Sequence, residues 1–351
     1  MKILHTSDIH LRKPDDSRWN ALILLLELAG KEDVDLFCIS GDLFDRESDA
    51  DVLRPQIRRL FSGRKFKVLI IPGNHDCDSY GGEYFGADAV VFTSAEIPYE
   101  TGGLNVWGIP FRPGGREGML KTLAFYRKNL PSDRMNIILY HGELLDSFFN
   151  RKDFGREGEE RYMPARLSDF SGLNAEYILA GHFHTNFSIK KFEGCYFVYP
   201  GSPVSVTRRE TGRRKANIFD AGAPPGELPL DTFFYDRKFV RFGPFDEISP
   251  LEKVEKAVGE ADENSHLILN LSGSFNGARF GTDETEIALN LKKFENEGCS
   301  FEPFEFRDMR RLACSELFAL FEEKLRARDM ASEARERIWE LAVRAMVEAG
   351  L

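Results

Sequence analysis

The fold of this chain can be inferred outward from the stretch Ile71-Pro72-Gly73-Asn74-His75-Asp76. It overlaps the apolar run Val68-Leu69-Ile70-Ile71, which predicts a buried strand. An amide, an imidazole and a carboxylate therefore come just after the C-terminal end of a strand, where open α/β sheets place ligand-binding groups. An amide carries no charge, so Asn74 is useful to a cation mainly when stronger ligands stand nearby.

Four other predicted strands also end at polar residues of metal-ligand type. Strands predicted over 3–6, 36–39, 137–140 and 177–180 are followed by Asp8-Ile9-His10, Gly41-Asp42, His141-Gly142 and Gly181-His182-Phe183-His184. Helical spacing over 19–29, 52–61 and 121–130 lies between the strands. This alternation predicts an α/β fold with a parallel or mixed sheet covered by helices, so the polar groups would line one crevice.

The strand ends carry seven side chains that suit a metal centre, namely Asp8, His10, Asp42, Asn74, His141, His182 and His184. Residues two apart in a strand share a face, so Asp8 and His10 can bind one ion together. A short loop could turn the other histidine pair toward two different ions. Imidazole, carboxylate and amide ligands suit manganese, iron or zinc in an open catalytic site. A single histidine at a strand end is more often structural, and we interpret His5 and His266 in that way.

Length and composition bound the class of protein. The 351 residues, 42% apolar and 30% charged, predict two domains and an appendage. The first residues do not resemble a signal peptide, and the longest apolar stretch, 21–28, is too short to span a bilayer. Five scattered cysteines without CxxC spacing favour reduced thiols in a cytoplasmic protein.

A segment rich in glycine and proline, 221–229, predicts a domain linker. It would separate a first domain over 1–221 from a small α/β domain over 230–308. In the small domain we expect strands over 233–242, 267–271 and 301–306 and helices over 250–261 and 283–297, with Ser249-Pro250 as a helix start.

The last segment, 309–351, predicts two amphipathic helices. Apolar residues recur there at helical spacing and include Leu317, Leu320, Phe321, Ile338, Leu341 and Met346. One interpretation is that the two helices pack on each other or on the body of the protein. The other is that they bind a partner helix.

The net charge of −10 provides no global attraction to nucleic acid. DNA binding would therefore depend on a local basic surface or on bound metal. The candidate DNA-binding residues are Arg12, Lys13, Arg208, Arg209, Arg213 and Arg214. Each basic cluster by itself is more often an ordinary solvated surface.

The five motifs together resemble the calcineurin-like metallophosphoesterases, whose pattern is DxH, GDxxD, GNHD or GNHE, a later H, and GHxH. The match covers about residues 1 to 205. The resemblance implies one metal held by Asp8, His10, Asp42 and His184, and a second held by Asp42, Asn74, His141 and His182. Asp42 would bridge two divalent ions, which together activate water and hold the oxygens of an in-line displacement at phosphorus.

The same resemblance implies catalytic roles for two further residues. His75 would stand beside the metals, steady the phosphoryl group and protonate the leaving oxygen, and Asp45 would orient it. Asp76 would hold the loop. These roles are those of the family. They are assigned here to Asp45 and His75 because these residues match the GDxxD and GNHD motifs.

Within this superfamily the chain looks most like the SbcD-type and Mre-type DNA repair nucleases. The block Ser7-Asp8-Ile9-His10-Leu11, the block Tyr199-Pro200-Gly201-Ser202-Pro203, the small α/β domain and the helical C-terminus support this. The resemblance implies a mixed-sheet sandwich covered by helices, a DNA-facing capping domain and C-terminal helices that bind an SMC-like ABC ATPase (SbcC type).

Such proteins are manganese-dependent 3′–5′ exonucleases and single-strand endonucleases of double-strand-break repair, and they act as homodimers. This chain departs from the pattern in having Arg12-Lys13 where a glycine often follows the HL pair, which leaves its substrate preference open. The alternative is a phosphodiesterase or phosphatase for small phosphoesters. It would use the same metals but would need neither the second domain nor the basic segment 208–215.

Overall fold

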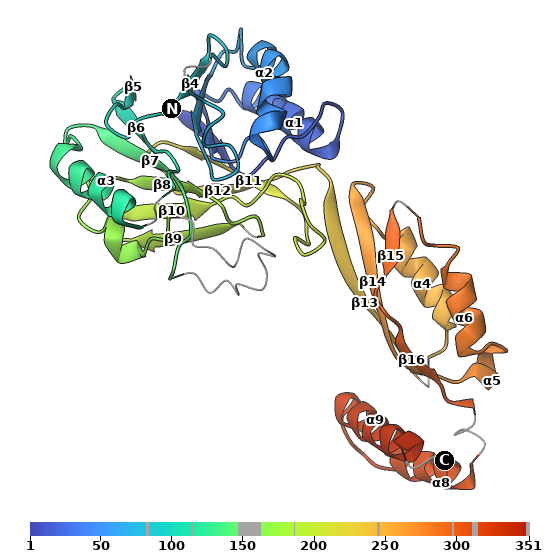
Figure 1. Ribbon diagram of the computed structural model, residues 1–351. Coiled ribbons are helices and arrows are strands. Elements are labelled where there is room, and N and C mark those ends of the chain that lie inside the picture. Colours follow the sequence, from blue (N-terminus) through green and yellow to red (C-terminus); the bar gives the residue numbers. More distant parts are fainter. Residues whose placement is uncertain are drawn as a thin grey trace. The chain divides into compact units, whose positions relative to one another are not determined.

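The computed structural model describes residues 1–81, 84–113, 116–146, 163–185, 187–243, 246–296, 298–310 and 315–348. The chain divides into two compact units, Met1–Tyr235 and Asp236–Leu351 (Figure 1). Within the described residues, no helix combines the length and the apolar character needed to cross a bilayer.

The first unit contains two mixed sheets. One has the strand order β12-β11-β1-β2-β3-β4, with bounds Lys2–Thr6 (β1), Leu36–Ser40 (β2), Lys67–Ile71 (β3), Ala89–Val91 (β4), Lys215–Asp220 (β11) and Gly226–Pro229 (β12). The other has the order β5-β6-β7-β8-β10-β9, with bounds Tyr99–Thr101 (β5), Leu104–Ile109 (β6), Met135–His141 (β7), Tyr177–Gly181 (β8), Ser188–Phe192 (β9) and Cys195–Tyr199 (β10). The strands β1 to β4 are parallel neighbours, and so are β6, β7, β8 and β10.

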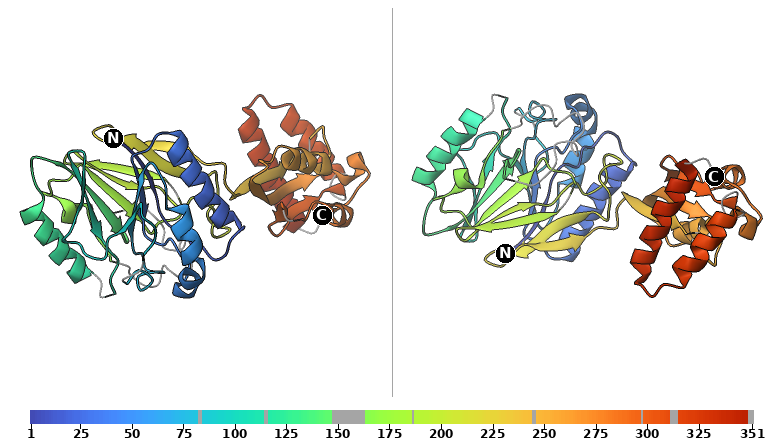
Figure 2. Two further views of the ribbon diagram at one scale, coloured as in Figure 1. Left: turned by 90° about the horizontal axis from the view of Figure 1, so that it is seen from above. Right: turned by 90° about the horizontal axis from the view of Figure 1, so that it is seen from below.

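Helices cover the outer faces of this sandwich, as the views along the sheets show (Figure 2). The helices α1 (Ser17–Lys31) and α2 (Glu47–Leu60) pack on the first sheet, and α3 (Arg116–Asn129) packs on the second. The 3-10 helix η2 (Leu167–Phe170) contributes Phe170 to the core beneath α3. The predicted fold class is confirmed.

The strands read as continuous apolar runs because both of their faces are buried. In β2, Leu36 and Cys38 belong to the core between the sheets, whereas Phe37 and Ile39 belong to the core beneath α1 and α2. The same division holds for the other central strands. Two layers of helix and two layers of sheet therefore fix both faces of every strand that leads to the polar strand ends.

The second unit contains a small α/β fold. Its sheet has the order β13-β14-β15, and β16 pairs with β14, with bounds Phe234–Phe242 (β13), Ser265–Phe275 (β14), Cys299–Phe301 (β15) and Glu305–Asp308 (β16). The helices are α4 (Pro250–Gly259), α5 (Gly277–Phe280) and α6 (Glu284–Leu291), and the core includes Val254 and Ile287. The predicted helix start is confirmed, because Ser249 and Glu252 form a capping box with Pro250 at the first turn.

The structure differs from three sequence-based expectations. The glycine- and proline-rich segment 221–229 is not a linker but the turn and last strand of the β11–β12 hairpin, and the units divide instead between Tyr235 and Asp236. The strand predicted over 301–306 is interrupted at Pro303, which cannot donate to a strand ladder. The helix predicted over 283–297 ends at Leu291, ahead of a turn in which Gly298 donates to the Asn296 side chain.

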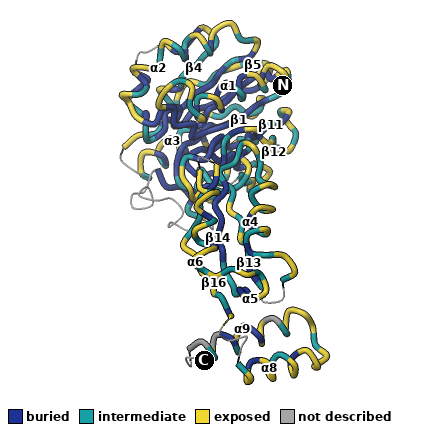
Figure 3. Tube along the Cα trace, turned by 90° about the vertical axis from the view of Figure 1, so that its right-hand side faces the viewer, coloured by how far each residue is buried: buried dark blue, intermediate teal, exposed yellow. Residues whose placement is uncertain are grey.

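The terminal helices α8 (Glu316–Arg326) and α9 (Ser332–Glu348) pack on each other through Phe318, Leu325, Trp339 and Val343. Phe321 and Met346 lie against this small core. Leu317 and Leu341 are 54% and 63% exposed, and Leu320 and Ile338 are also exposed. Exposed residues recur along both helices in Figure 3. Mutual packing therefore uses one set of apolar residues and leaves another at the surface.

The buried His5 makes the stability of the first unit depend on pH. Burial lowers the pKa of His5 to about 3, whereas an unfolded histidine titrates near pH 6.5. The unfolded chain binds more protons between these values, so stability falls as the pH drops below 6.5. We expect this side chain to lower the free energy of unfolding by about 2 kcal/mol between pH 7 and pH 5.

His5→Gln should reduce the pH dependence of unfolding by that amount. The measurement is urea unfolding at both pH values, followed by tryptophan fluorescence in a Trp339→Phe background, so that Trp19 and Trp107 of the first unit report the transition. Equal pH slopes for the two proteins would contradict the expectation.

Candidate metal centre

The strand ends of both sheets meet at one place. Because parallel strands have their carboxyl ends at one edge of a sheet, β1, β2 and β3 deliver side chains to the same edge. The strands β7 and β8 do so in the second sheet, which packs against the first through a shared core. The structure brings together all of the predicted ligand residues, namely Asp8, His10, Asp42, Asn74, His141, His182 and His184.

One group consists of Asp8, His10 and His184. Each offers a ligand atom, and these atoms lie within 4.8 Å of one another. The Nε2 atoms of His10 and His184 are 3.1 Å apart, and Nε2 of His184 lies 3.7 Å from Oδ1 of Asp8. Three donors of the types that bind divalent metals thus face a common point.

A second group gathers around Asn74. Its Oδ1 lies 2.8 Å from Nε2 of His141 and 3.3 Å from Nδ1 of His182. The carboxylate of Asp42 stands between the two groups, since its Oδ2 lies 3.3 Å from Nε2 of His141 and 3.8 Å from Nε2 of His10. The geometry matches a pair of cation sites that share one carboxylate.

The donor chemistry of the second group fits a cation. Nδ1 of His141 lies 2.8 Å from the carbonyl oxygen of Ser40, which can only accept a hydrogen bond, so that nitrogen carries the proton. In the neutral ring Nε2 then presents a lone pair toward Asn74 and Asp42. Lone pairs that converge in a buried place attract a metal ion, and imidazole with carboxylate and amide oxygen is a suitable ligand set.

Electrostatics favour the same conclusion. Burial raises the pKa of Asp8. Burial also opposes ionisation of Asp42, but His141 outweighs it and the pKa of Asp42 is lowered. Burial alone would lower the pKa of His141, yet Asp42 raises it to about 9. The two carboxylates thus create a local demand for positive charge, which a proton on His141 or a divalent cation can satisfy.

Unusual backbone conformations hold the ligand side chains in place. Asp8, His10, Asp42 and His182 have φ values of 57°, 53°, 53° and 107°, a region that side chains other than glycine rarely adopt. Such strain is typical of functional sites and persists only where the surrounding structure imposes it. Here the main chain of the loop after β1 bonds the loop after β2, for example from Asp8 N to the carbonyl of Gly41 at 3.1 Å.

Glycines in the motifs allow the loops to approach closely. A Cβ on Gly73 would lie 2.0 Å from Oδ1 of Asp42, and one on Gly181 would lie 2.0 Å from the carbonyl oxygen of Ser40. Gly41 has φ of +91°, and a Cβ there would lie 2.1 Å from Nδ1 of His141. A side chain at any of these three positions would collide with the ligand residues or their loops, and Gly41 also has a backbone conformation that favours glycine.

His75 lies beside the two groups with its ring edge-on to His10, at 4.7 Å between centroids. Its main-chain N donates to Asp42 at 2.9 Å. One ring nitrogen of His75 also lies within 4.8 Å of ligand atoms of His10 and Asp42, so His75 is close enough to these two residues to share a metal ion with them.

The structure differs from the expected orientation of His75 by Asp45. Nδ1 of His75 meets the main-chain oxygen of Asp45 at 3.0 Å, whereas the Asp45 carboxylate accepts from Arg12 and Arg18, both at 2.9 Å. Burial opposes ionisation of Asp45, but these two arginines lower its pKa. Asp76 holds the loop, as expected, since it accepts from Gly73 N and from the Tyr80 hydroxyl.

The predicted DNA-binding residues have different environments. Arg214 is buried and donates to the carbonyl oxygens of Ser202 and His184, so it is not a surface contact for DNA. Arg213 bonds Asp231. Arg12 pairs with Asp45, and Lys13, Arg208 and Arg209 are exposed.

Glu210 is a site residue that the sequence reasoning missed. It is buried and its Oε1 lies 3.3 Å from Nδ1 of His184. Burial opposes ionisation, but the hydrogen bond from His184 helps to lower the pKa of Glu210 to about 2. In the sequence it stands among arginines, in a cluster that resembles a solvated surface, and only the fold shows that it points inward.

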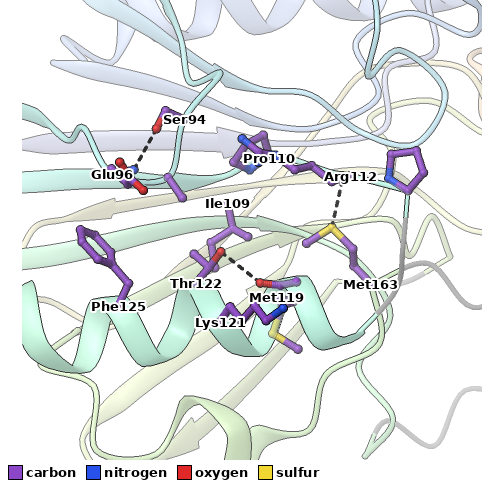
Figure 4. A pocket seen from close by; sticks show the side chains of 13 residues that line it. Ser94, Glu96, Ile109, Pro110, Arg112, Met119, Lys121, Thr122, Phe125 and Met163 are labelled. Atoms are coloured by element: carbon purple, nitrogen blue, oxygen red, sulfur yellow. Dashed lines mark hydrogen bonds between the residues drawn. The ribbon is translucent and has the colours of Figure 1, made fainter.

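A separate cavity of about 390 Å³ lies beside α3 at the end of β6 (Figure 4). Its walls combine apolar side chains, among them Ile109, Met119, Phe125 and Met163, with polar ones such as Glu96 and Lys121. Arg112 also lines the cavity, and its main-chain N donates to the sulfur of Met163. None of the predicted ligand residues lines it, so the cavity is distinct from the candidate metal centre.

Comparison with known proteins identifies the family. The model of the calcineurin-like phosphoesterase family matches residues 1–186. That match spans more than half of the chain and every one of the converging strand ends.

The chain belongs to the calcineurin-like phosphoesterase family. A curated relative is the DNA double-strand break repair protein Mre11 of Saccharolobus solfataricus, 28% identical over 232 residues, which cover 60% of this chain and 56% of the relative. The chain thus spans about half the length of that relative. This likeness supports the resemblance to the Mre-type and SbcD-type nucleases, and family membership supports a metal-dependent phosphoester hydrolase.

Two solved structures are more remote. The protein TT1561 of Thermus thermophilus is 16% identical, with a TM-score of 0.39 over 61% of this chain and 92% of that chain. GAP50, the anchor in the inner membrane complex of Plasmodium, is 10% identical, with a TM-score of 0.39 over 62% of this chain and 80% of that chain.

Gly73→Ala should displace the Asp42 carboxylate, because the added Cβ would overlap Oδ1 of Asp42 and would lie only 2.4 Å from the main-chain N of Asp42. We expect the variant to fold and to bind less metal than the wild type, as measured by elemental analysis after incubation with manganese. The matched control is Gly30→Ala in α1, where a Cβ meets nothing within 4 Å. Unchanged metal content in Gly73→Ala would contradict the assigned crowding.

Proposed function

We propose that this protein is a dimetal DNA nuclease, with 3′–5′ exonuclease and single-strand endonuclease activity in DNA end processing and double-strand-break repair. The observation that carries the proposal is the pair of ligand groups that share Asp42 at the ends of strands from two sheets. The similarity to an Mre11 protein supports DNA as the substrate.

The residues of the centre suit an anionic substrate. Two divalent ions, for which we propose manganese, would supply a water of lowered pKa and neutralise charge on the phosphate. Asp8, His10, Asp42 and His184 would hold one ion, and Asp42, Asn74, His141 and His182 the other. Their burial and hydrogen bonds keep the ligands in place before substrate arrives, which is how a preorganised site stabilises developing charge.

His75 would exchange a proton with the leaving oxygen. Because the carbonyl of Asp45 can only accept, Nδ1 of His75 carries a hydrogen, and Nε2 is the atom that can give or take a proton. His75 is half-buried, so its ring edge can reach a substrate that approaches from solvent. Asp45 would act through its main chain, while its carboxylate holds Arg12 and Arg18 beside the site.

Activity assays separate this proposal from the small-phosphoester alternative. The purified full-length protein with manganese would be given circular single-stranded DNA, 3′-labelled linear duplex and a chromogenic phosphodiester. The nuclease proposal expects nicking of the circle and release of the 3′ label. Cleavage of the chromogenic diester alone, also in the presence of an SbcC-type ATPase, would favour the phosphodiesterase alternative.

His75→Ala should retain both metals and lose most turnover, since general acid catalysis typically contributes about 100- to 10,000-fold. The measurements are manganese content by elemental analysis and the rate of DNA cleavage on one preparation. Loss of metal in this variant would instead make His75 a ligand, as its cluster with His10 and Asp42 permits.

We also propose that the exposed apolar residues of the terminal helices bind the coiled-coil base of an SMC-like ABC ATPase, and that the protein acts as a homodimer. Leu317→Glu with Leu341→Glu should abolish co-purification with an SbcC-type subunit, because a charge would replace apolar contact area. The control is Leu289→Glu on α6, a residue that is likewise exposed, at 64%. Equal recovery of the ATPase with all variants would remove the proposed docking surface.

A further inference from the structure

The ring of His184 lies between two sets of polar atoms. Its Nε2 faces His10 and Asp8 of the first ligand group, at 3.1 and 3.7 Å. Its Nδ1, on the opposite side of the ring, faces Oε1 of Glu210 at 3.3 Å. Glu210 is only 3% exposed and belongs to the loop between β10 and β11.

The Glu210 carboxylate is itself held in one orientation. The main-chain N of Val206 donates to its Oε2 at 2.7 Å, and the hydroxyl of Thr207 donates to its Oε1 at 3.0 Å. The hydroxyl of Ser202 lies 3.3 Å from Oε2. A carboxylate with this many fixed donors has little freedom to rotate away from His184.

A buried arginine completes the arrangement. Arg214 donates to the carbonyl oxygens of Ser202 at 2.9 Å and Thr185 at 3.2 Å, and also to that of His184. The positive charge of Arg214 offsets the negative charge of Glu210 in a place from which solvent is largely excluded. The loop therefore holds His184 by two hydrogen bonds, one from the ring to Glu210 and one from Arg214 to the main chain.

The ligand histidines are supported by different acceptors. For His141 the acceptor at Nδ1 is the neutral carbonyl of Ser40. For His184 it is a carboxylate. A carboxylate behind a ligating imidazole fixes its tautomer and makes the opposite nitrogen a stronger donor to metal than a neutral acceptor does.

We propose that Glu210 is a positioning residue that sets the tautomer and the metal affinity of His184. The inference rests on the proposed metal centre and adds to it a residue outside the ligand set. Glu210 accepts the Nδ1 hydrogen, so the lone pair of His184 is at Nε2, directed at the first ligand group. Arg214 keeps the carboxylate charge stable in the interior and holds the main chain of His184 in register.

The first test is manganese binding to the full-length protein by titration calorimetry. Wild type should bind two ions, and Glu210→Gln should weaken one of the two sites by about 10- to 100-fold while leaving the other unchanged. The matched control is Glu227→Gln, which removes a half-exposed carboxylate paired with Lys215 in the same unit. It should bind both ions as wild type does.

A double-variant cycle asks whether Glu210 acts through His184. Glu210→Gln should cause no further loss of manganese affinity in a His184→Ala background, because the two residues would belong to one unit. Full additivity of the two losses would overturn the proposal. Two ions bound with wild-type affinity by Glu210→Gln would also overturn it and leave the nuclease proposal standing, whereas absence of manganese binding in wild type would overturn both.

A second measurement needs no variant and so does not depend on the folding of Glu210→Gln. Long-range ¹H–¹⁵N spectra of the metal-free wild type at pH 8 should show His184 as the Nδ1–H tautomer. A neutral ring that carries its proton on Nε2 would contradict the role given to Glu210.

Discussion

Asp42 carries a carboxylate in a place from which solvent is almost entirely excluded, and much of the surrounding structure acts to make that charge tolerable. Burying an unpaired charge costs far more than a domain's net stability, so partners must be built in. Here the partners are the main-chain N of His75 and the imidazoles of His10 and His141, to which a divalent ion of the kind that the family uses would add. The need to satisfy Asp42 links strands from both sheets.

That need explains the local strain. To surround one carboxylate with imidazoles, the loops after β1, β2, β3 and β8 must pass within van der Waals contact of one another. Glycines at 41, 73 and 181 remove the side chains that would collide, and non-glycine residues such as Asp8 and His182 accept left-handed conformations. The four-layer sandwich provides the packing energy that holds these loops in shape, because every central strand is buried on both faces.

The loop that carries Glu210 and Arg214 also connects the centre to the strand that leads out of the first unit. Ser205 donates to the carbonyl of Phe233, and Gly212 donates to that of Tyr235, at the start of β13. The Ser205 hydroxyl also donates to the main chain of Glu210. The segment that supports His184 and the segment from which the second unit begins thus share one hydrogen-bonded network.

Much of this architecture was already determined by the sequence. Strands that are buried on both faces appear in the sequence as uninterrupted apolar runs. The glycines, carboxylates and histidines that follow these runs could therefore be assigned to strand ends from the sequence. The short strands β4, β5 and β9 were missed because they are only partly buried and their patterns are mixed. The turn and second strand of the β11–β12 hairpin, residues 221–229, were mistaken for a linker because turns and linkers are both rich in glycine and proline.

Only the tertiary structure decided how the side chains of the centre share their protons and charges. The Asp45 carboxylate accepts from arginines, and it is the main-chain oxygen of Asp45 that contacts His75. The sequence did not show this, because long-range packing determines which atom of a residue faces a neighbour. Glu210 and Arg214 show the same limit: a glutamate and an arginine in a charged stretch belong by pattern to the surface. They are buried because each satisfies a specific group across the fold, and that information lies in contacts between distant segments rather than in local periodicity.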